Sequence, residues 1–164
     1  MSQDPDTIMK FPENQNHKIK FMKAALAEAK KAADKNEVPV GAVVVYQGKI
    51  IARGHNQRES RQAFHSHAEF LAMMKAAAKL KSWRLEDCEV YVTMEPCPMC
   101  AGAMIQARIK SLYYGIKDPK AGVAESLVNL FDLPFNHHIK IEGGLLENES
   151  KALLQAFFKQ LRSS

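Results

Sequence analysis

The sequence predicts a three-layer α/β/α domain in which five strands form a mixed sheet flanked by helices. Apolar residues recur at helical spacing in several segments, and these segments alternate with short runs rich in β-branched residues. The first two runs are separated only by Gln47-Gly48, a two-residue loop that is typical of an antiparallel hairpin. The later runs are separated by helix-length segments, which implies parallel crossovers. We therefore expect an antiparallel first hairpin in an otherwise parallel sheet.

The first half of the chain is expected to form a helix, the hairpin and a loop. A helix is expected over residues 18–34, where apolar residues recur at steps of three and four and lysines stand between them. The run 40–46 is almost entirely apolar, which predicts a strand buried on both faces. Its partner strand is expected over 49–53, and a polar loop over 54–64.

The second half of the chain alternates helices and strands. Helices are expected over 66–80 and 96–108, as a short segment ending near Phe131, and over 148–161. In the last helix, acidic residues near the start and basic residues near the end suit the helix dipole. Strands are expected over 88–93, 111–115 and 138–141.

Composition limits the class of protein. The chain has 164 residues, 46% hydrophobic and 25% charged, which indicates one globular domain and excludes collagen, coiled-coil arrays and disorder. We expect a flexible arm over residues 1–16 and a single domain over 17–164. The three cysteines cannot form a secreted disulfide framework, and no signal peptide or membrane span stands out, so a cytoplasmic location is expected. The net charge of +5 favours an anionic partner, although an ordinary soluble basic surface explains it equally well.

Two short motifs carry the candidate chemistry. One contains His67 and Glu69 at the expected start of a helix, and the other contains Cys97 and Cys100 at the start of the next helix. Residues three apart share a helix face, and a helix N-terminus favours the thiolate that binds metal. One histidine and two cysteines make three zinc ligands, which is the catalytic arrangement that leaves a fourth place for water. Cys88 alternates with the residues of a strand and is expected in the core.

The spacing of His67 and Glu69 constrains their geometry. Positions two apart lie on nearly opposite sides of a helix, so both face one site only if His67 lies in the first turn, with Ser66 as the expected N-cap. Glu69 would then stand beside the zinc and could move a proton from its water. Taken alone, the cysteine pair could be a redox pair or part of a structural zinc site, and His-x-Glu alone is uninformative. Together, in this order, they predict a zinc hydrolase.

The combination of H-x-E and P-C-x-x-C is the signature of the zinc deaminases. Over residues 19–162 the sequence further resembles the tRNA-specific adenosine deaminases within that superfamily. The shared stretches are residues 38–43, 54–56, 67–69, 95–103, 117–122, 136–137, 144–146, 152–154 and 157–158.

The resemblance implies a cytidine deaminase-like fold and a homodimeric enzyme that converts adenosine to inosine at the wobble position of a tRNA anticodon. It implies that His67, Cys97 and Cys100 hold one Zn²⁺ per chain and that Glu69 shuttles protons. Asn56, a turn former on residue type alone, would bind the flipped base. The RNA is expected to meet the pocket mouth at a set of mainly basic residues: Arg58, Arg61, Lys117, Asp118, Lys120, Phe158 and Lys159. Apolar residues of the third helix are expected at the dimer interface: Met99, Ala101, Ala103 and Met104.

One loop departs from the family pattern. Residues 63–66 read Ala-Phe-His-Ser where the family usually has Asp-Pro-Thr-Ala. We expect His65, like His17 and His55, at the surface or facing RNA. Pro98 also occurs often in guanine and cytosine deaminases, so a free-base or nucleoside deaminase is the alternative enzyme. An RNA-binding module stapled by zinc is the alternative without catalysis, and in it Glu69 would be dispensable.

Overall fold

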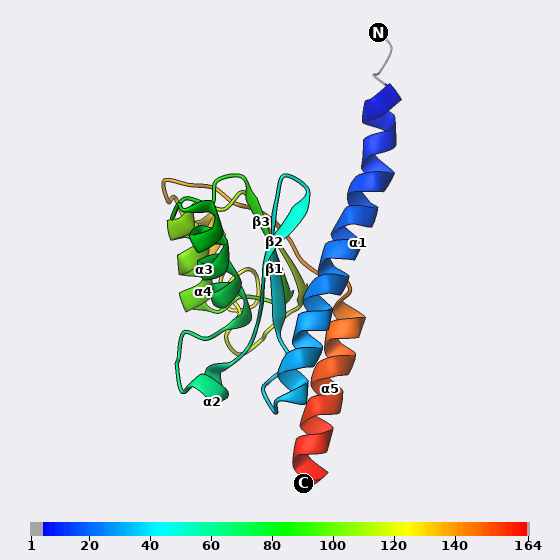
Figure 1. The fold of residues 1–164 in the computed structure, drawn as a ribbon, viewed down its shortest axis with the longest axis vertical. Coiled ribbons are helices and arrows are strands. Elements are labelled where there is room, and N and C mark those ends of the chain that lie inside the picture. The colour runs from blue at the N-terminus through cyan, green and yellow to red at the C-terminus, as the bar shows by residue number, and fades with distance from the viewer. Residues whose placement is uncertain (1–4, 164) are drawn as a thin grey trace.

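Five strands form one mixed sheet at the centre of the molecule (Figure 1). The computed structural model describes residues 5–163, with side chains described from residue 15 onward. The strand order is β2-β1-β3-β4-β5. β1 is antiparallel to both β2 and β3, while β3, β4 and β5 run parallel, which confirms the expected mixed sheet. The strands are β1 (Gly41–Tyr46), β2 (Lys49–His55), β3 (Cys88–Met94), β4 (Ser111–Ile116) and β5 (Lys140–Glu142).

Helices cover both faces of the sheet (Figure 1). α1 (Pro5–Asp34) and α5 (Glu147–Ser163) lie side by side on one face, and α3 (Ala68–Leu80) and α4 (Pro98–Ala107) cover the other. Alternate strand residues serve the two faces, since Val43 and Tyr91 pack against α1 whereas Val44 and Val90 pack toward α3 and α4. Among the described residues, no helix combines the length and the apolar character that crossing a bilayer requires.

The hairpin turn and one glycine bring the site-bearing segments together. Gln47 and Gly48 both have positive φ, 51° and 75°, as a two-residue hairpin loop requires. Near the end of β2, a Cβ on Gly54 would lie 2.5 Å from the carbonyl oxygen of Ala68. The missing side chain therefore lets the N-terminal turn of α3 lie directly on β2.

Several boundaries differ from the sequence prediction. α1 begins at Pro5, so most of the expected arm is helical, and residues 1–4 of that arm lie outside the described residues. Proline is favoured in a first helical turn, where its missing N–H costs nothing. A one-turn helix, α2 (Arg58–Arg61), lies within the expected loop, and η1 (Leu130–Asp132) is the short helix near Phe131. His67, rather than Ser66, is the N-cap of α3, so Ser66 lies outside the helix.

Candidate active site

His67 stands where the backbone changes from loop to helix. As the N-cap of α3 it has extended backbone angles, φ −84° and ψ 152°. Its side chain therefore does not follow the helical spacing, and it shares one pocket with Glu69. His67 and Glu69 thus line one pocket, but the expected arrangement was wrong, because His67 is the N-cap itself rather than a residue of the first turn behind a Ser66 cap.

The two cysteines begin the neighbouring helix. Cys97 is the N-cap of α4, Pro98 occupies the first helical position as predicted, and Cys100 lies in the first turn. Hydrogen bonding from the Cys100 thiol and from His67 lowers the pKa of Cys97, although burial opposes this. Cys88, by contrast, lies fully buried in the core, as expected, and burial raises its pKa to about 11.

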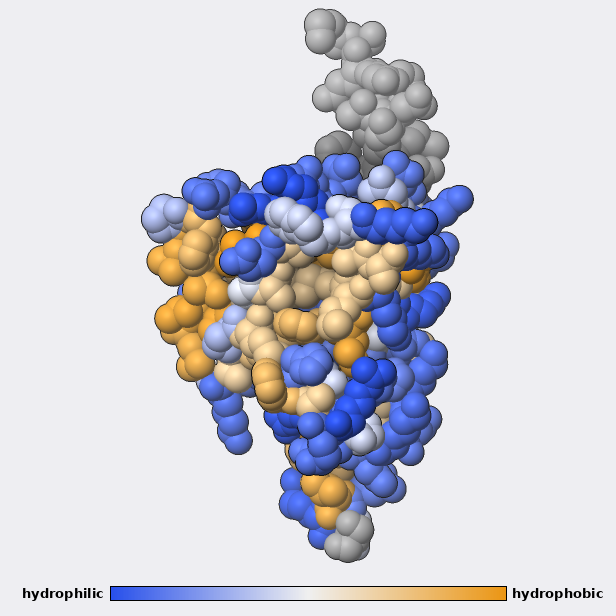
Figure 2. All heavy atoms as spheres, turned by 60° about the vertical axis from the view of Figure 1, so that its left-hand side comes forward, coloured by the Kyte–Doolittle hydropathy of each residue, from blue (hydrophilic) through white to orange (hydrophobic). Residues whose placement is uncertain are grey.

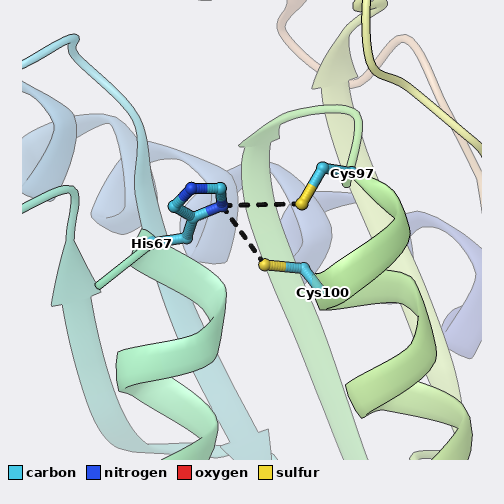
Figure 3. A group of neighbouring side chains, drawn as sticks. All are labelled: His67, Cys97 and Cys100. Atoms are coloured by element: carbon cyan, nitrogen blue, oxygen red, sulfur yellow. Dashed lines mark hydrogen bonds between the residues drawn. The ribbon is translucent and has the colours of Figure 1, made fainter. Parts of the chain in front are cut away.

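Three side chains converge on one point (Figure 3). The Nδ1 atom of His67 lies 3.6 Å from the Sγ of Cys97 and 3.5 Å from the Sγ of Cys100. A tetrahedral zinc with ordinary Zn–N and Zn–S bonds would hold such atoms about 3.6 Å apart. The donor set and its spacing therefore fit a zinc ion bound by three protein ligands, and of the described residues only these three form such a group.

Glu69 lies next to this group but is not part of it. Its side chain is 4% exposed and lines the same pocket. Burial raises the pKa of Glu69 to about 7, with a further contribution from the charge on Cys97 and opposed by hydrogen bonding to its own backbone. A carboxyl group with such a pKa can both accept and donate a proton near neutral pH.

Asn56 is held with a defined orientation in the pocket wall. Its Nδ2 donates to the carbonyl oxygen of Val38 at 3.2 Å, and its Oδ1 accepts from the backbone N–H of Arg58 at 3.1 Å. A carbonyl oxygen only accepts and an amide N–H only donates, so these two contacts fix which end of the amide is which. One N–H and one lone pair of the amide are left over, a pairing that suits the edge of a nucleobase.

A buried carboxylate that lines the pocket, Glu95, organises the turn that follows β4. Glu95 accepts hydrogen bonds from the backbone N–H groups of Asp118 (3.0 Å), Ala124 (2.9 Å), Glu125 (2.8 Å) and Ser126 (2.9 Å), and from the Ser126 hydroxyl. Burial would raise the pKa of Glu95, but these hydrogen bonds outweigh it and lower the pKa. A Cβ on Gly122 would lie 2.4 Å from the Glu95 Oε1, so the turn approaches the carboxylate closely.

The structure brings most of the predicted site residues into one pocket and leaves others outside. The lining includes Asn56, Arg58, His67, Glu69, Cys97, Asp118, Lys120 and Phe158. Phe158 is 40% exposed and thus not a core residue. Lys117, Lys159 and Arg61 do not line the pocket, and the Nζ of Lys117 lies 3.6 Å from a carboxylate oxygen of Glu125.

His55 corrects one expectation, because it is buried rather than at the surface. Its Nδ1 lies 3.4 Å from the Oε1 of Glu28, a buried carboxylate of α1. Glu28 also accepts a hydrogen bond from Lys31 at 2.6 Å. His17 is exposed, and His65 is half-buried with its ring against Phe64 and Phe70.

Three buried carboxylates were missed by sequence reasoning: Glu28, Glu37 and Glu95. A glutamate on the lysine-rich helix, or beside a proline, reads as an ordinary surface residue. The signals available were weak: Glu37 directly precedes the most apolar run of the chain, and Glu95 directly precedes the cysteine motif.

Comparison with known proteins gives the class. Residues 15–162 match the family model of the MafB19-like deaminases. Together with the mixed sheet, this match makes the chain a deaminase, and its His-Cys-Cys group could hold a metal ion.

Individual relatives narrow the class. The tRNA-specific adenosine deaminase of Bacillus subtilis is 49% identical over 143 residues, which cover 87% of this chain and 89% of the relative. The chloroplastic tRNA(adenine(34)) deaminase of Arabidopsis thaliana is 45% identical and covers 87% of this chain, which corresponds to only 12% of that long protein. The chain belongs to the family of tRNA-specific adenosine deaminases.

Solved structures agree with this assignment. A structure from a study of A-to-I editing by tRNA:A34 deaminases superposes with a TM-score of 0.79 at 44% identity, covering 82% of this chain and 98% of that one. Guanine deaminase from Nitrosomonas europaea superposes with a TM-score of 0.70 at 27% identity, covering 84% of this chain and 82% of that one. The fold is shared with free-base deaminases, whereas the higher identity lies with the tRNA enzymes.

Proposed function

We propose that this protein deaminates adenosine to inosine at the wobble position of a tRNA anticodon. The observation that carries the proposal is the placement of the buried Glu69 beside His67, Cys97 and Cys100 in a pocket walled by Asn56. Relatives that are named tRNA-specific adenosine deaminase are 44–49% identical to this protein over most of the chain. Since the enzyme acts on tRNA, we also propose that it works in the cytoplasm.

The residues of the pocket divide the work of hydrolysis. Zinc held by His67, Cys97 and Cys100 would lower the pKa of a bound water toward neutrality. Glu69 takes a proton from the attacking water, whose oxygen adds to C6 of adenine, and delivers this proton to the neighbouring ring nitrogen. Glu69 then moves the second proton of the water to the amino group, and the bond between C6 and this nitrogen breaks. Water and adenosine thus give inosine and ammonia. The base must leave the stack to enter, which costs least in a single-stranded anticodon loop.

Asn56 and the basic residues serve binding. The free amide N–H and lone pair of Asn56 hold the edge of the base, and Arg58 and Lys120 at the pocket mouth hold phosphates. Phe158 offers a ring on which a neighbouring base can stack.

An inosine assay on an anticodon stem-loop tests the function. Zinc-loaded protein is incubated with a stem-loop carrying adenosine at the wobble position, and in parallel with free guanine, free cytosine and free adenosine. We expect inosine in the RNA and at most trace deamination of the free compounds. Turnover of free guanine with no inosine in the RNA would assign the protein to the guanine deaminases, whose fold it shares.

The apolar face of α3 and α4 supports a second proposal, a homodimer. Side chains of both helices and of Trp83 line shallow apolar depressions there: Phe70, Met74, Ala77, Trp83, Met99, Ala103 and Ala107. Figure 2 shows orange and pale orange atoms gathered on this side of the molecule. Of the residues expected at the interface, Ala101 and Met104 are fully buried in the core, so only Met99 and Ala103 are available. A large apolar patch of this kind is typical of an interface.

Light scattering at micromolar concentration tests the homodimer. We expect twice the chain mass for the wild type and the chain mass for Met74→Lys, because a charge in an apolar interface is costly. Ala27→Lys, on the exposed face of α1, is the matched control and should remain dimeric. A wild-type monomer would exclude the homodimer without affecting the deaminase assignment.

A further inference from the structure

The one-turn helix α2 carries part of the pocket wall but has no anchor in the core. None of its four residues is buried, and its N-cap, Gln57, makes no side-chain capping hydrogen bond. Nevertheless Arg58 lines the pocket, and Asn56 lies two residues before it. A helix this short is not stable by itself, so something outside it must hold it in place.

Glu37 holds α2 from a distant part of the sequence. It lies in the connection between α1 and β1, and only 1% of it is exposed. One carboxylate oxygen accepts the N–H of Glu59 at 3.1 Å, and the other accepts the N–H of Ser60 at 2.6 Å. These N–H groups belong to the first turn and lack partners within the helix. A negative charge at this end also suits the helix dipole.

The residues after Glu37 hold Asn56 itself. The carbonyl oxygen of Val38 accepts from the side chain of Asn56 at 3.2 Å, and that of Val40 accepts from its backbone N–H at 3.0 Å. Both valines also line the pocket. Residues 37–40 and 56–60 are thus joined by four hydrogen bonds, and together they form one wall.

We propose that Glu37 is a positioning residue for the deamination, whose carboxylate fixes α2 so that Asn56 and Arg58 keep their places in the pocket wall. The proposal rests on the proposed function, since it assigns Glu37 to the binding of the same substrate. Burial would raise the pKa of Glu37, but hydrogen bonds from Ser60 and Glu59 outweigh this and lower its pKa, as expected for an acceptor that works as the anion.

Steady-state kinetics on the anticodon stem-loop separate positioning from stability. Glu37→Gln has the same shape but turns an NH₂ group toward one of the two backbone N–H groups. We expect the KM to rise about tenfold, since a hydrogen bond to a charged group is lost, while kcat stays within about threefold and the zinc content stays the same. A purely structural role would reduce the active fraction, and thus kcat, at an unchanged KM.

Two further variants test whether Glu37 affects KM by acting through Asn56. Glu142→Gln is the control: Glu142 lies on β5 and does not line the pocket, and its carboxylate is 3.3 Å from the Nζ of Lys18. This variant should leave KM unchanged. In an Asn56→Ala background, Glu37→Gln should raise KM much less than it does in the wild type, because residues acting through one another are non-additive. Full additivity of the two changes would overturn the proposal.

Failure of this inference is distinguishable from failure of the proposed function. If the wild type forms inosine and Glu37→Gln has the wild-type KM, Glu37 does not position the wall and the function stands. If the wild type forms no inosine, the proposed function is wrong. Amide hydrogen exchange then tests by itself whether Glu37 holds α2 in place. Faster exchange of the Glu59 and Ser60 amides in Glu37→Gln than in the wild type supports the positioning role of Glu37. Equal exchange in the two proteins overturns it.

Discussion

At the scale of single residues, the division of labour between His67 and Glu69 depends on where α3 begins. The N-cap residue has extended rather than helical backbone angles, so the side chain of His67 does not follow the helical spacing. Because His67 is the N-cap, both side chains reach one pocket, His67 with Nδ1 toward the cysteines and Glu69 buried beside them. The proposed zinc ligand and the proposed proton carrier thus lie only two residues apart in the sequence.

Replacing Glu69 tests its role as proton carrier. Glu69→Ala should retain fold and zinc but lose kcat on the stem-loop by about 10²–10⁴-fold or more, the range of proton-transfer catalysis. The zinc ligands are unchanged in this variant, so zinc content by elemental analysis serves as its control. Near-normal turnover of Glu69→Ala would contradict the role of Glu69 as proton carrier.

Replacing Cys100 tests the metal centre. Its Sγ is one of the three converging donor atoms, and it is fully buried, so no surface group can take its place. We expect the wild type to carry about one zinc per chain, and Cys100→Ala should lose most of it. Cys88→Ala is the matched control, since it also removes a buried thiol but should retain the zinc. Full zinc content in Cys100→Ala would rule out this site.

At the scale of elements, the sequence was sufficient where a pattern is local. The hairpin, the parallel strands and the cysteine-bearing helix follow from periodicity and turn residues, and the site motifs lie at helix starts as expected. α2 could not be predicted, because it is held by Glu37 from a distant part of the chain rather than by its own residues. The burial of His55 was missed for the same reason, since its partner Glu28 lies on α1.

The turn held by Glu95 makes a prediction about acid stability. The pKa of Glu95 is lowered on folding, so its contribution is present above the unfolded pKa of about 4.3 and is lost as the pH falls through the lower, folded value. Glu95→Gln should therefore be less stable than the wild type at pH 7, and the difference should shrink toward pH 3. Urea unfolding of both proteins at several pH values measures this difference in the free energy of unfolding. Any contribution of zinc to the pH dependence is common to both proteins and cancels in the difference. A difference independent of pH would show that Glu95 carries no charge-dependent stability.

At the scale of the whole molecule, two of the basic side chains lie in the pocket that the proposed substrate must enter. Arg58, in α2, and Lys120, in the turn that Glu95 holds, both line the pocket. Lys117, the residue after β4, is largely exposed and lies three residues before Lys120 in the sequence. An RNA loop whose extruded base enters the pocket can thus be bound by phosphate contacts from both of these segments.

Salt dependence tests this arrangement. Each phosphate contact to single-stranded RNA contributes about 0.7 log unit of affinity per log unit of salt. Replacing Lys117 and Lys120 together with alanine should weaken stem-loop binding and flatten the slope by up to about 1.4, without changing zinc content. Lys20→Ala with Lys23→Ala, on the exposed face of α1, removes the same charge away from the pocket and should leave the slope closer to that of the wild type. If both double variants flatten the slope equally, the RNA responds to net charge alone and the two lysines beside the pocket hold no particular phosphate.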